Sequence, residues 1–275
     1  MGSDFIFDCD AYLERIGVDV PIVASEDCLE ALHRAHVYTI PFENFDILLG
    51  RGVDLSMPHV FSKIIRQPRG GYCFELNGLF LYLLQCLGFQ AIPLLARVHN
   101  RGKPSGRHHQ LSLVTIKGRE WIADVGFGAN GLRAPVPFET MRTATQDGLE
   151  YRLIASPPYG TMLQVLEAGL WQNLYSFDLE HVCEADIYSG NHYTSTSPWS
   201  FFTWSRVANL PTSTGRVSLN DFSLTVVAGG VTEVMELEHN ASYLERIREY
   251  FGIVIDEPYA SLQPLHQKRI DNDRK

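Results

Sequence analysis

The chain has 275 residues, which is long enough for one large domain or two domains of average size. Its apolar content of 45% and charged content of 20% are ordinary for a globular protein and argue against a disordered or fibrous chain. The formal net charge is −9, whereas a general nucleic-acid binder normally carries the opposite sign. Five cysteines at wide spacings, without a CxxC pair, favour neither a disulfide framework nor a cysteine zinc site and are typical of a reducing compartment.

The N-terminal segment lacks the features of a targeting signal. Residues 1–13 contain three aspartates and no basic cluster, unlike the start of a secretory signal peptide. The most apolar stretch, residues 79–84, is broken by Gln85 and Gly88 and is far shorter than the ~20 apolar residues of a membrane span. We therefore expect a cytoplasmic protein with no membrane partner and no nucleic-acid partner.

Apolar residues at helical spacing dominate the first third of the chain. We expect Asp10 to cap a short helix that ends at Ile16, and Ser25 to cap the next helix. Ser56 precedes a further helical pattern over residues 57–66.

From about Pro93 the period of the apolar residues changes from 3.6 to 2, which indicates β-strands. The expected strands are residues 94–98, 110–116, 120–126, 150–155, 162–167 and 170–177. The pairs Lys117-Gly118 and Ala168-Gly169 predict hairpin turns between neighbouring strands.

The last third of the chain combines strand and helix patterns. Residues 191–202 are rich in Ser, Thr and Pro, and we expect a loop or linker there. Expected strands at 218–227 and 231–237 flank a Gly229-Gly230 turn, and Asn240 is expected to cap a final helix. The order of helices, antiparallel strands and a mixed unit predicts an α+β fold.

Cys73 is the most informative residue of the sequence. It follows a Gly-Gly pair and begins a helix that Gly88 is expected to end. The apolar residues of this helix recur with helical spacing at Leu76, Leu79, Phe80, Leu83, Leu84 and Leu87. A thiol at a helix start meets the positive end of the helix dipole and unpaired N–H groups, which favour the reactive thiolate. A small buried hydrophobe is the commoner role of a cysteine, so position alone leaves both roles open.

A thiolate nucleophile usually has a histidine partner that a carboxylate orients. Two neighbouring histidines, His108 and His109, begin an expected strand. His109 shares a strand face with Leu111 and Leu113, so it is the candidate that points inward.

Asp124 is the candidate carboxylate. If Lys117-Gly118 is a two-residue turn, Asp124 lies diagonal to His109 on the same face, with the backbones ~7–8 Å apart. A buried aspartate needs a partner. Spacing alone therefore leaves two alternatives: a catalytic set of Cys73, His109 and Asp124, or a structural pair of His109 and Asp124.

Residues 126–131 match GxGxxG after an expected strand, but Pro135 and Pro137 follow where a dinucleotide-binding fold would place its helix. We expect instead a tight loop that lets a ligand approach the backbone beside Asp124. The remaining histidines show no HExxH or comparable spacing, so no metal is expected.

Four segments of the chain resemble the arylamine N-acetyltransferase family. Residues 69–77, with the sequence RGGYCFELN, are similar to the active-site cysteine motif of that family. The other three, in the family's order, are residues 40–44 (IPFEN), residues 109–111 with 121–128, and residues 195–198 (STSP). Together these segments span most of the chain.

This resemblance implies three domains and a papain-like Cys-His-Asp arrangement. Residues 1–92 would form a helical bundle that carries the nucleophilic Cys73, and residues 93–195 an antiparallel β-barrel that carries His109 and Asp124. Residues 196–275 would form an α/β lid. Fifteen positions separate His109 from Asp124, as in the family pattern, which selects His109 over His108.

The resemblance also implies a ping-pong acetyl transfer in xenobiotic metabolism. Cys73 would take acetyl from acetyl-CoA as a thioester, and an arylamine, hydrazine or N-hydroxyarylamine would then receive it. The family positions that line the aromatic acceptor pocket correspond to Phe42, Phe127 and Phe202. The positions at which some members contact CoA correspond to Ser105 and Gly106.

Two alternatives to acetyl transfer remain: another acyl chemistry on the same scaffold, and hydrolysis. The same scaffold could use another acyl donor, or form an internal amide as the amide synthases of this family do. A Cys-His-Asp hydrolase is a third reading, against which the complete set of acetyltransferase segments weighs. Of the other four cysteines, Cys28 and Cys86 fall within or beside apolar helical stripes, and Cys9 and Cys183 have no chemical context in the sequence, so no reactive role is expected for any of them.

Overall fold

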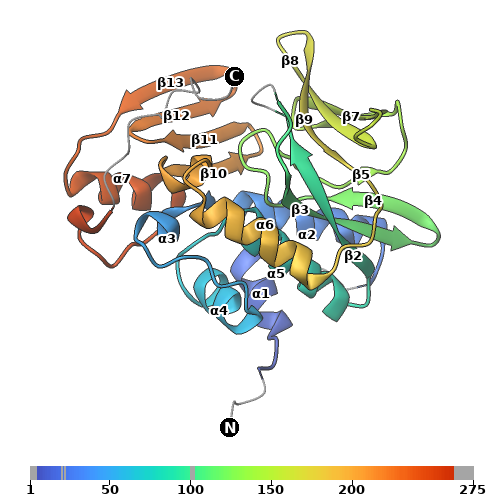
Figure 1. Ribbon diagram of the computed structural model, residues 1–275, viewed down its shortest axis with the longest axis horizontal. Helices are drawn as coiled ribbons and strands as arrows, with labels where there is room; N and C mark the ends of the chain where they lie inside the picture. The colour runs from blue at the N-terminus through green and yellow to red at the C-terminus, as the bar shows by residue number, and fades with distance from the viewer. Residues whose placement is uncertain (1–4, 20, 22, 100–102, 263–275) are drawn as a thin grey trace.

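The computed structural model describes residues 5–19, 21, 23–99 and 103–262. In Figure 1 a layer of helices lies below, and two antiparallel sheets rise above it on opposite sides of the molecule. Three buried clusters of apolar side chains fill the helical layer, the larger sheet and the smaller sheet. The fold is α+β, as the order of elements predicts.

The helical layer consists of α1 (Cys9–Ile16), α2 (Glu26–Thr39), α3 (Phe45–Leu48), α4 (Met57–Phe61), a π-helical turn (Ser62–Arg66) and α5 (Cys73–Cys86). The cap of α2 is confirmed, because Ser25 Oγ accepts a hydrogen bond from Cys28 N at 3.3 Å. The N-cap predicted for α1, Asp10, is wrong. Asp8 caps it by accepting from Ala11 N at 2.9 Å, while Asp10 lies in the first turn, where a carboxylate also favours the helix dipole.

The larger sheet has the strand order β5-β4-β3-β2-β9-β8-β7-β6 and curls into a nearly closed barrel. Its strands are β2 (Gln90–Val98), β3 (Arg107–Ile116), β4 (Arg119–Ala123), β5 (Val136–Pro137), β6 (Thr143–Gln146), β7 (Leu149–Ala155), β8 (Thr161–Glu167) and β9 (Leu170–Phe177). Lys117 and Gly118 both have positive φ, 50° and 79°, as a two-residue hairpin turn requires. Ile116 pairs with Arg119, so the register predicted for β3 and β4 is confirmed.

The smaller sheet joins the last third of the chain to a piece of the first third. Its strands are β1 (Phe42–Glu43), β10 (Val207–Thr212), β11 (Gly215–Asn220), β12 (Ser223–Ala228) and β13 (Val231–Glu236). The predicted single strand at 218–227 is wrong, because the chain turns back at Asp221, whose φ is 59°. The final helix α7 (Ser242–Phe251) packs on this sheet, and Asn240 Oδ1 accepts from Ser242 N at 2.8 Å.

The loop predicted at residues 191–202 is wrong in its first half. Helix α6 (Glu184–Thr196) runs to Thr196, and a 3-10 turn (Phe201–Thr203) follows it; a second 3-10 turn (Tyr259–Ser261) lies near the end of the described chain. The buried positions of α6 are small and polar, namely Gly190, Asn191, Thr194 and Ser195. The sequence therefore shows no apolar stripe there, although tertiary packing still forms a helix.

The expected domain boundaries fall within elements of secondary structure. Position 92–93 lies inside β2, and position 195–196 lies at the end of α6. The division into three domains stays a prediction. Within the part of the chain that the structure describes, no helix combines the length and the apolar character that crossing a membrane requires.

Two fully buried histidines of α2 lie against α5. His36 Nδ1 hydrogen bonds with the Tyr12 hydroxyl at 2.5 Å, and the rings of His33 and His36 both meet Phe80 edge-on. Burial lowers the pKa of His33 to about 4 and the pKa of His36 to about 3. An imidazole in the unfolded chain titrates near 6.5, so the unfolded chain binds these protons first as the pH falls.

The neutral histidines should make the protein acid-sensitive. Their contribution to stability is complete above pH 6.5 and is lost as the pH falls toward 4, at about 1.4 kcal/mol per pH unit for each imidazole. His36→Asn keeps an acceptor for Tyr12 but cannot titrate, so the free energy of unfolding should depend less steeply on pH in this window. Denaturant unfolding at several pH values measures the slope. His59→Asn, which changes an exposed histidine of α4, should leave the slope of the unfolding free energy against pH unchanged. An unchanged slope in His36→Asn would contradict the low pKa assigned to His36.

Candidate active site

Cys73 is the first residue of α5 and is 4% exposed. The two glycines before it bring the loop against β1. A Cβ on Gly70 would lie 1.9 Å from the carbonyl oxygen of Pro41, and Gly71 O accepts a hydrogen bond from Glu43 N at 2.8 Å. The Gly-Gly pair is thus needed for this close approach, which determines where α5 begins.

Five buried charged side chains lie beneath this loop. The Arg69 guanidinium donates to Glu43 at 2.9 Å and to Asp46 at 2.8 Å. The Lys63 ammonium lies 2.7 Å from Asp46 and 2.8 Å from Glu75. Burial by itself would lower the pKa of Lys63, but the surrounding carboxylates raise it well above its usual range.

This charged cluster reaches the cysteine through Glu75. One oxygen of Glu75 pairs with Lys63, and the other accepts from Tyr72 N at 3.0 Å. Because Tyr72 directly precedes Cys73, the cluster holds the first turn of α5 in place. Arg69 and Glu75 were not predicted from the sequence as site residues, although charged residues next to a buried helix are a signal for paired charges.

His109 and Asp124 meet as the predicted hairpin requires. His109 Nε2 lies 2.7 Å from Asp124 Oδ2, and the two residues are 3% and 1% exposed. Since Nε2 is engaged, Nδ1 is the ring nitrogen left for Cys73, which is among the groups that raise the pKa of His109. The structure therefore brings together all three predicted catalytic residues, from α5, β3 and the end of β4.

Asp124 has further partners that hold its orientation. Its Oδ1 accepts from Asn77 Nδ2 at 2.9 Å and from Gly126 N at 3.0 Å, and its own N–H donates to His33 Nε2 at 3.2 Å. The same Asn77 amide donates to the backbone of Gln110 at 2.6 Å. Asn77 was not predicted to orient Asp124, although an amide one helical turn after the cysteine lies on the same helix face.

The electrostatics of this pair favour a protonated His109. Burial by itself would lower the pKa of His109, but the charge and hydrogen bond of Asp124, with smaller contributions from Cys73, raise it to about 10. Burial would raise the pKa of Asp124, yet His109, Asn77 and Gly126 together keep it below its usual value. At neutral pH the site thus holds an imidazolium between a carboxylate and a thiol, an arrangement that stabilises a thiolate.

The three predicted acceptor-pocket residues lie near the triad or near Tyr72, which precedes Cys73. Phe202 lies 5.8 Å from Phe42 and 6.0 Å from Tyr72, measured between ring centroids. Phe127 meets the His109 ring edge-on at 5.3 Å. These rings come from β1, the loop after β4 and the 3-10 turn after α6, so three distant parts of the chain supply the aromatic wall.

A small cavity lies beside the rings of Phe42 and Phe127. A cavity of about 10 Å³ is lined by Phe42, Asp124, Phe127, Gly128 and Asn209 among other residues. That volume holds at most one water molecule.

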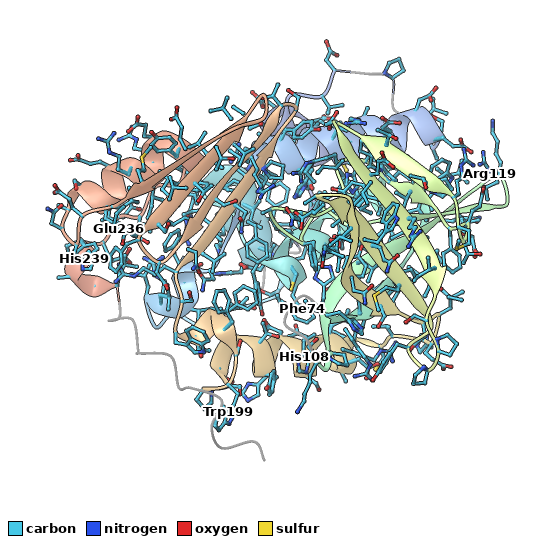
Figure 2. The ribbon with its side chains drawn as sticks, turned by 90° about the horizontal axis from the view of Figure 1, so that it is seen from above. Phe74, His108, Arg119, Trp199, Glu236 and His239 are labelled. Atoms are coloured by element: carbon cyan, nitrogen blue, oxygen red, sulfur yellow. The ribbon has the colours of Figure 1, made fainter. Side chains whose placement is uncertain are left out.

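Helix α6 covers the start of α5. A Cβ on Gly190 would lie 2.7 Å from the Phe74 ring, and the Tyr72 hydroxyl donates to Asn191 Oδ1. Tyr193 of the same helix stacks on His108 with ring centroids 4.3 Å apart. Figure 2 shows Phe74 and His108 beside this helix. His108 thus contacts α6 with its ring, while its carbonyl oxygen lies 3.8 Å from Cys73 Sγ.

Ser105 and Gly106 lie on the segment that leads into β3. Ser105 Oγ accepts from Val98 N at 2.9 Å and donates to Gly106 O at 2.6 Å. A Cβ on Gly106 would lie 2.4 Å from His108 Nε2. Both residues therefore shape the turn before His108, and their predicted contact with CoA stays a prediction.

The loop at residues 126–131 lies close to the triad, and its predicted role in ligand approach stays a prediction. A Cβ on Gly126 would lie 3.0 Å from the Cα atom of Cys73, so only glycine fits there. Within residues 5–19, 21, 23–99 and 103–262, no group of three or more His, Cys, Asp or Glu side chains is placed to hold a metal ion.

Comparison with known proteins identifies the scaffold. A family model described as N-acetyltransferase matches residues 26–260, a range that contains every site residue described above. The chain belongs to the arylamine N-acetyltransferase family. It is 36% identical to the arylamine N-acetyltransferase of Escherichia coli (strain K12) over 251 residues, which cover 90% of this chain and 89% of that protein.

Solved structures of this family agree with the fold. The arylamine N-acetyltransferase of Salmonella typhimurium superposes with a TM-score of 0.87 at 32% identity, covering 92% of this chain and 96% of that chain. The Mycobacterium marinum enzyme, solved in complex with CoA, superposes with a TM-score of 0.87 at 32% identity and covers 93% and 97%. The resemblance of the four sequence segments to arylamine N-acetyltransferases, a family of acyltransferases, is confirmed.

The different surroundings of the two neighbouring histidines predict different effects on the thiol. His109→Ala removes the buried cation, so alkylation of Cys73 by iodoacetamide at pH 7 should slow by roughly tenfold or more, because the thiolate is the reacting form. His108→Ala removes a ring that stacks on α6 and should change the rate by about twofold or less. Peptide mapping identifies the modified cysteine. Equal rates for the two variants, or the opposite ranking, would contradict this geometry.

Proposed function

We propose that this enzyme transfers acetyl from acetyl-CoA to arylamines, hydrazines and N-hydroxyarylamines through a thioester on Cys73. The observation that carries the proposal is the buried pair of His109 and Asp124, 2.7 Å apart, with Cys73 among the groups that raise the pKa of His109. Family membership supports the donor, since a relative has been solved in complex with CoA.

In the first half-reaction Cys73 acts as the nucleophile. Its thiolate attacks the thioester carbonyl of acetyl-CoA, a bond forms between Sγ and the acetyl carbon, and the bond to the CoA sulfur breaks. The CoA thiolate takes a proton from the His109 imidazolium and leaves. His109 is then neutral, and Asp124 still holds its ring in orientation.

In the second half-reaction the acceptor amine attacks the acetyl carbon on Cys73. The bond between that carbon and Sγ breaks, and His109 takes the proton that the amine loses. The products are the N-acetylated amine and the original pair of Cys73 thiolate and His109 imidazolium. The net reaction balances as acetyl-CoA plus amine giving CoA plus amide.

Two features of the site favour transfer over hydrolysis. The triad residues are nearly excluded from solvent, at 4%, 3% and 1% exposed for Cys73, His109 and Asp124, so a thioester there meets few water molecules. The aromatic rings of Phe42, Phe127 and Phe202 provide apolar faces on which a flat aromatic amine can pack.

Intact mass spectrometry tests the proposal. The chain incubated with acetyl-CoA alone should gain one acetyl group on Cys73 and lose it when 4-aminosalicylate or isoniazid is added. Cys73→Ser should gain no acetyl group, whereas Cys183→Ser, which changes an exposed cysteine, should behave as the wild type. Parallel incubations with longer acyl-CoAs identify the preferred donor.

Each alternative gives a different outcome in this experiment. An adduct formed with a longer acyl-CoA but not with acetyl-CoA would assign the chain to another acyl donor. CoA release at the same rate with and without an amine, and no lasting adduct, would identify a hydrolase. Acetyl transfer by Cys73→Ser at the wild-type rate would end the nucleophile assignment.

A further inference from the structure

Strand β1 connects the loop before Cys73 to the smaller sheet. On one side, Glu43 N donates to Gly71 O at 2.8 Å, two residues before the nucleophile. On the other side, both residues of β1 pair with β10. A strand of only two residues thus joins the start of α5 to a sheet built mainly from the last third of the chain.

Asn44 directly follows β1 and extends this connection with its side chain. The residue is 3% exposed. Its Nδ2 donates to Phe202 O at 2.8 Å and to Ser205 O at 2.7 Å. Its Oδ1 accepts from Val207 N at 2.8 Å. Both amide hydrogens and the amide oxygen are therefore engaged, all of them with backbone groups some 160 positions later in the chain.

These three partners belong to the segment that carries the Phe202 ring. None of the three residues of its 3-10 turn is buried, so the place of the turn depends on hydrogen bonds that tie its backbone to the rest of the chain. The ring itself packs 5.8 Å from Phe42 and 6.0 Å from Tyr72, measured between centroids. Asn44 therefore holds the backbone of a residue whose ring lies beside β1 and beside the neighbour of Cys73.

We propose that Asn44 is a positioning residue that holds the Phe202 ring where an aromatic acceptor packs, and so gives the site its preference for aromatic over non-aromatic molecules. The inference rests on the proposed function in taking Phe202 as part of the acceptor wall. Asn44 acts through this ring and takes no part in the bonds made and broken on Cys73. Asn44→Ala leaves two carbonyl oxygens and one N–H without their partner, so the segment has to shift to pair them again.

A matched pair of alkylating reagents measures this preference at the thiol. Bromoacetamide and N-phenyl-2-bromoacetamide present the same reacting carbon, and only the second carries a ring. Each rate at Cys73 is followed by peptide mapping and divided by the rate with free cysteine. The wild type should favour the phenyl reagent, and Asn44→Ala should lower that preference roughly fivefold or more, because ring packing is lost. The rate with bromoacetamide should change by about twofold or less, because the thiol keeps its triad partners.

A double-mutant cycle separates positioning from a general structural role. Phe202→Ala should lower the preference as Asn44→Ala does, and the double variant should lose little beyond Phe202→Ala alone, because both changes act on one ring. Asn44→Asp is the second variant. It keeps the size and the acceptor toward Val207 N but loses both donors, so it should show the same loss. Asn240→Ala, which removes the hydrogen bond to Ser242 N at the start of α7, should behave as the wild type.

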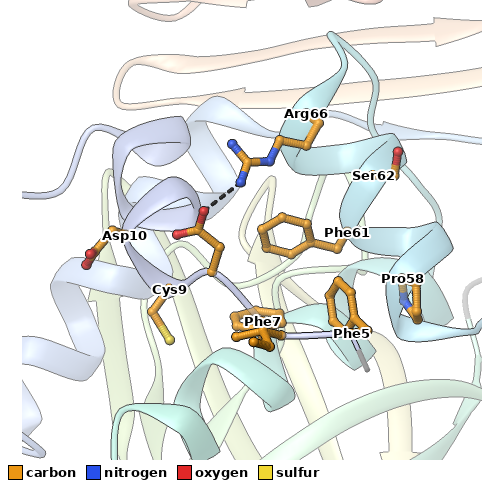
Figure 3. Close-up of a pocket in the computed structure, with 10 residues that line it drawn as sticks. Phe5, Phe7, Cys9, Asp10, Pro58, Phe61, Ser62 and Arg66 are labelled. Atoms are coloured by element: carbon orange, nitrogen blue, oxygen red, sulfur yellow. Dashed lines mark hydrogen bonds and ion pairs between the residues drawn. The ribbon is translucent and has the colours of Figure 1, made fainter. Parts of the chain in front are cut away.

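A second aromatic surface provides an internal control. Figure 3 shows Cys9 at a hollow of about 600 Å³ that Phe5, Phe7 and Phe61 help to line. No lining residue of this hollow belongs to the triad or to the hydrogen bonds of Asn44. The relative rates of the two reagents at Cys9 should therefore be the same in the wild type and in Asn44→Ala.

Acetyl transfer supplies a second arm. The acetylated wild type and Asn44→Ala are mixed with 4-aminosalicylate or with hydrazine, which has a nucleophilic nitrogen but no ring. Asn44→Ala should slow transfer to 4-aminosalicylate and leave transfer to hydrazine within about twofold, because only the first acceptor packs on Phe202. A wild type that transfers acetyl to neither acceptor would refute the proposed function, and the alkylation ratio would still decide the role of Asn44.

Four results of the alkylation experiment would overturn the role of Asn44. They are a wild type without preference for the phenyl reagent, an unchanged preference in both Asn44 variants, an equal slowing of both reagents, and additive losses in the double variant. A preference lost to the same extent at Cys9 would likewise show a general loosening of the chain rather than an effect on Phe202.

Discussion

Asp124 is 1% exposed, and an ionised carboxylate at that depth is tolerated only where hydrogen bonds and a countercharge replace its water. The chain meets this demand with groups from separate elements. His109 comes from β3, Asn77 from α5 and the Gly126 N–H from the following loop. Each of these elements must reach its place for the carboxylate to be satisfied, so the barrel and the helical layer are coupled at this one residue.

The same coupling places the nucleophile. Asn77 and Cys73 lie on one face of α5, so the helix that orients the carboxylate also presents the thiol. At the start of that helix the buried charges of Lys63, Arg69 and Glu75 hold the Gly-Gly turn. Two buried polar networks, one on each side of Cys73, therefore limit its movement, which suits a residue that must meet a histidine with little tolerance.

Regular periodicity predicted the parts of this fold that depend on local patterns. Residues close in sequence determine the apolar spacing of α5, the hairpin turn at Lys117-Gly118 and the strand face on which His109 lies. These local patterns were enough to predict that the three catalytic candidates lie together. Features that depend on distant residues were missed. β1 is two residues long and pairs with β10, some 165 positions later, so no local pattern marks it.

Helix α6 shows the same limit. The buried side of α6 is made of Gly190, Asn191 and other small residues that fit against Phe74, which composition alone assigns to a loop. Packing between elements far apart in the chain, rather than propensity, decides these features.

Buried Asp124 keeps His109 protonated beside the Cys73 thiol, and nitrogen-15 NMR of the imidazole rings across a pH titration measures this protonation state, with Asp124→Asn as the matched variant. We expect the His109 ring of the wild type to carry both protons throughout pH 7 to 8, because its pKa is raised to about 10, and we expect the ring to be neutral there in Asp124→Asn. A wild-type His109 ring that is neutral at pH 7 would show that Asp124 does not hold the proton on this histidine.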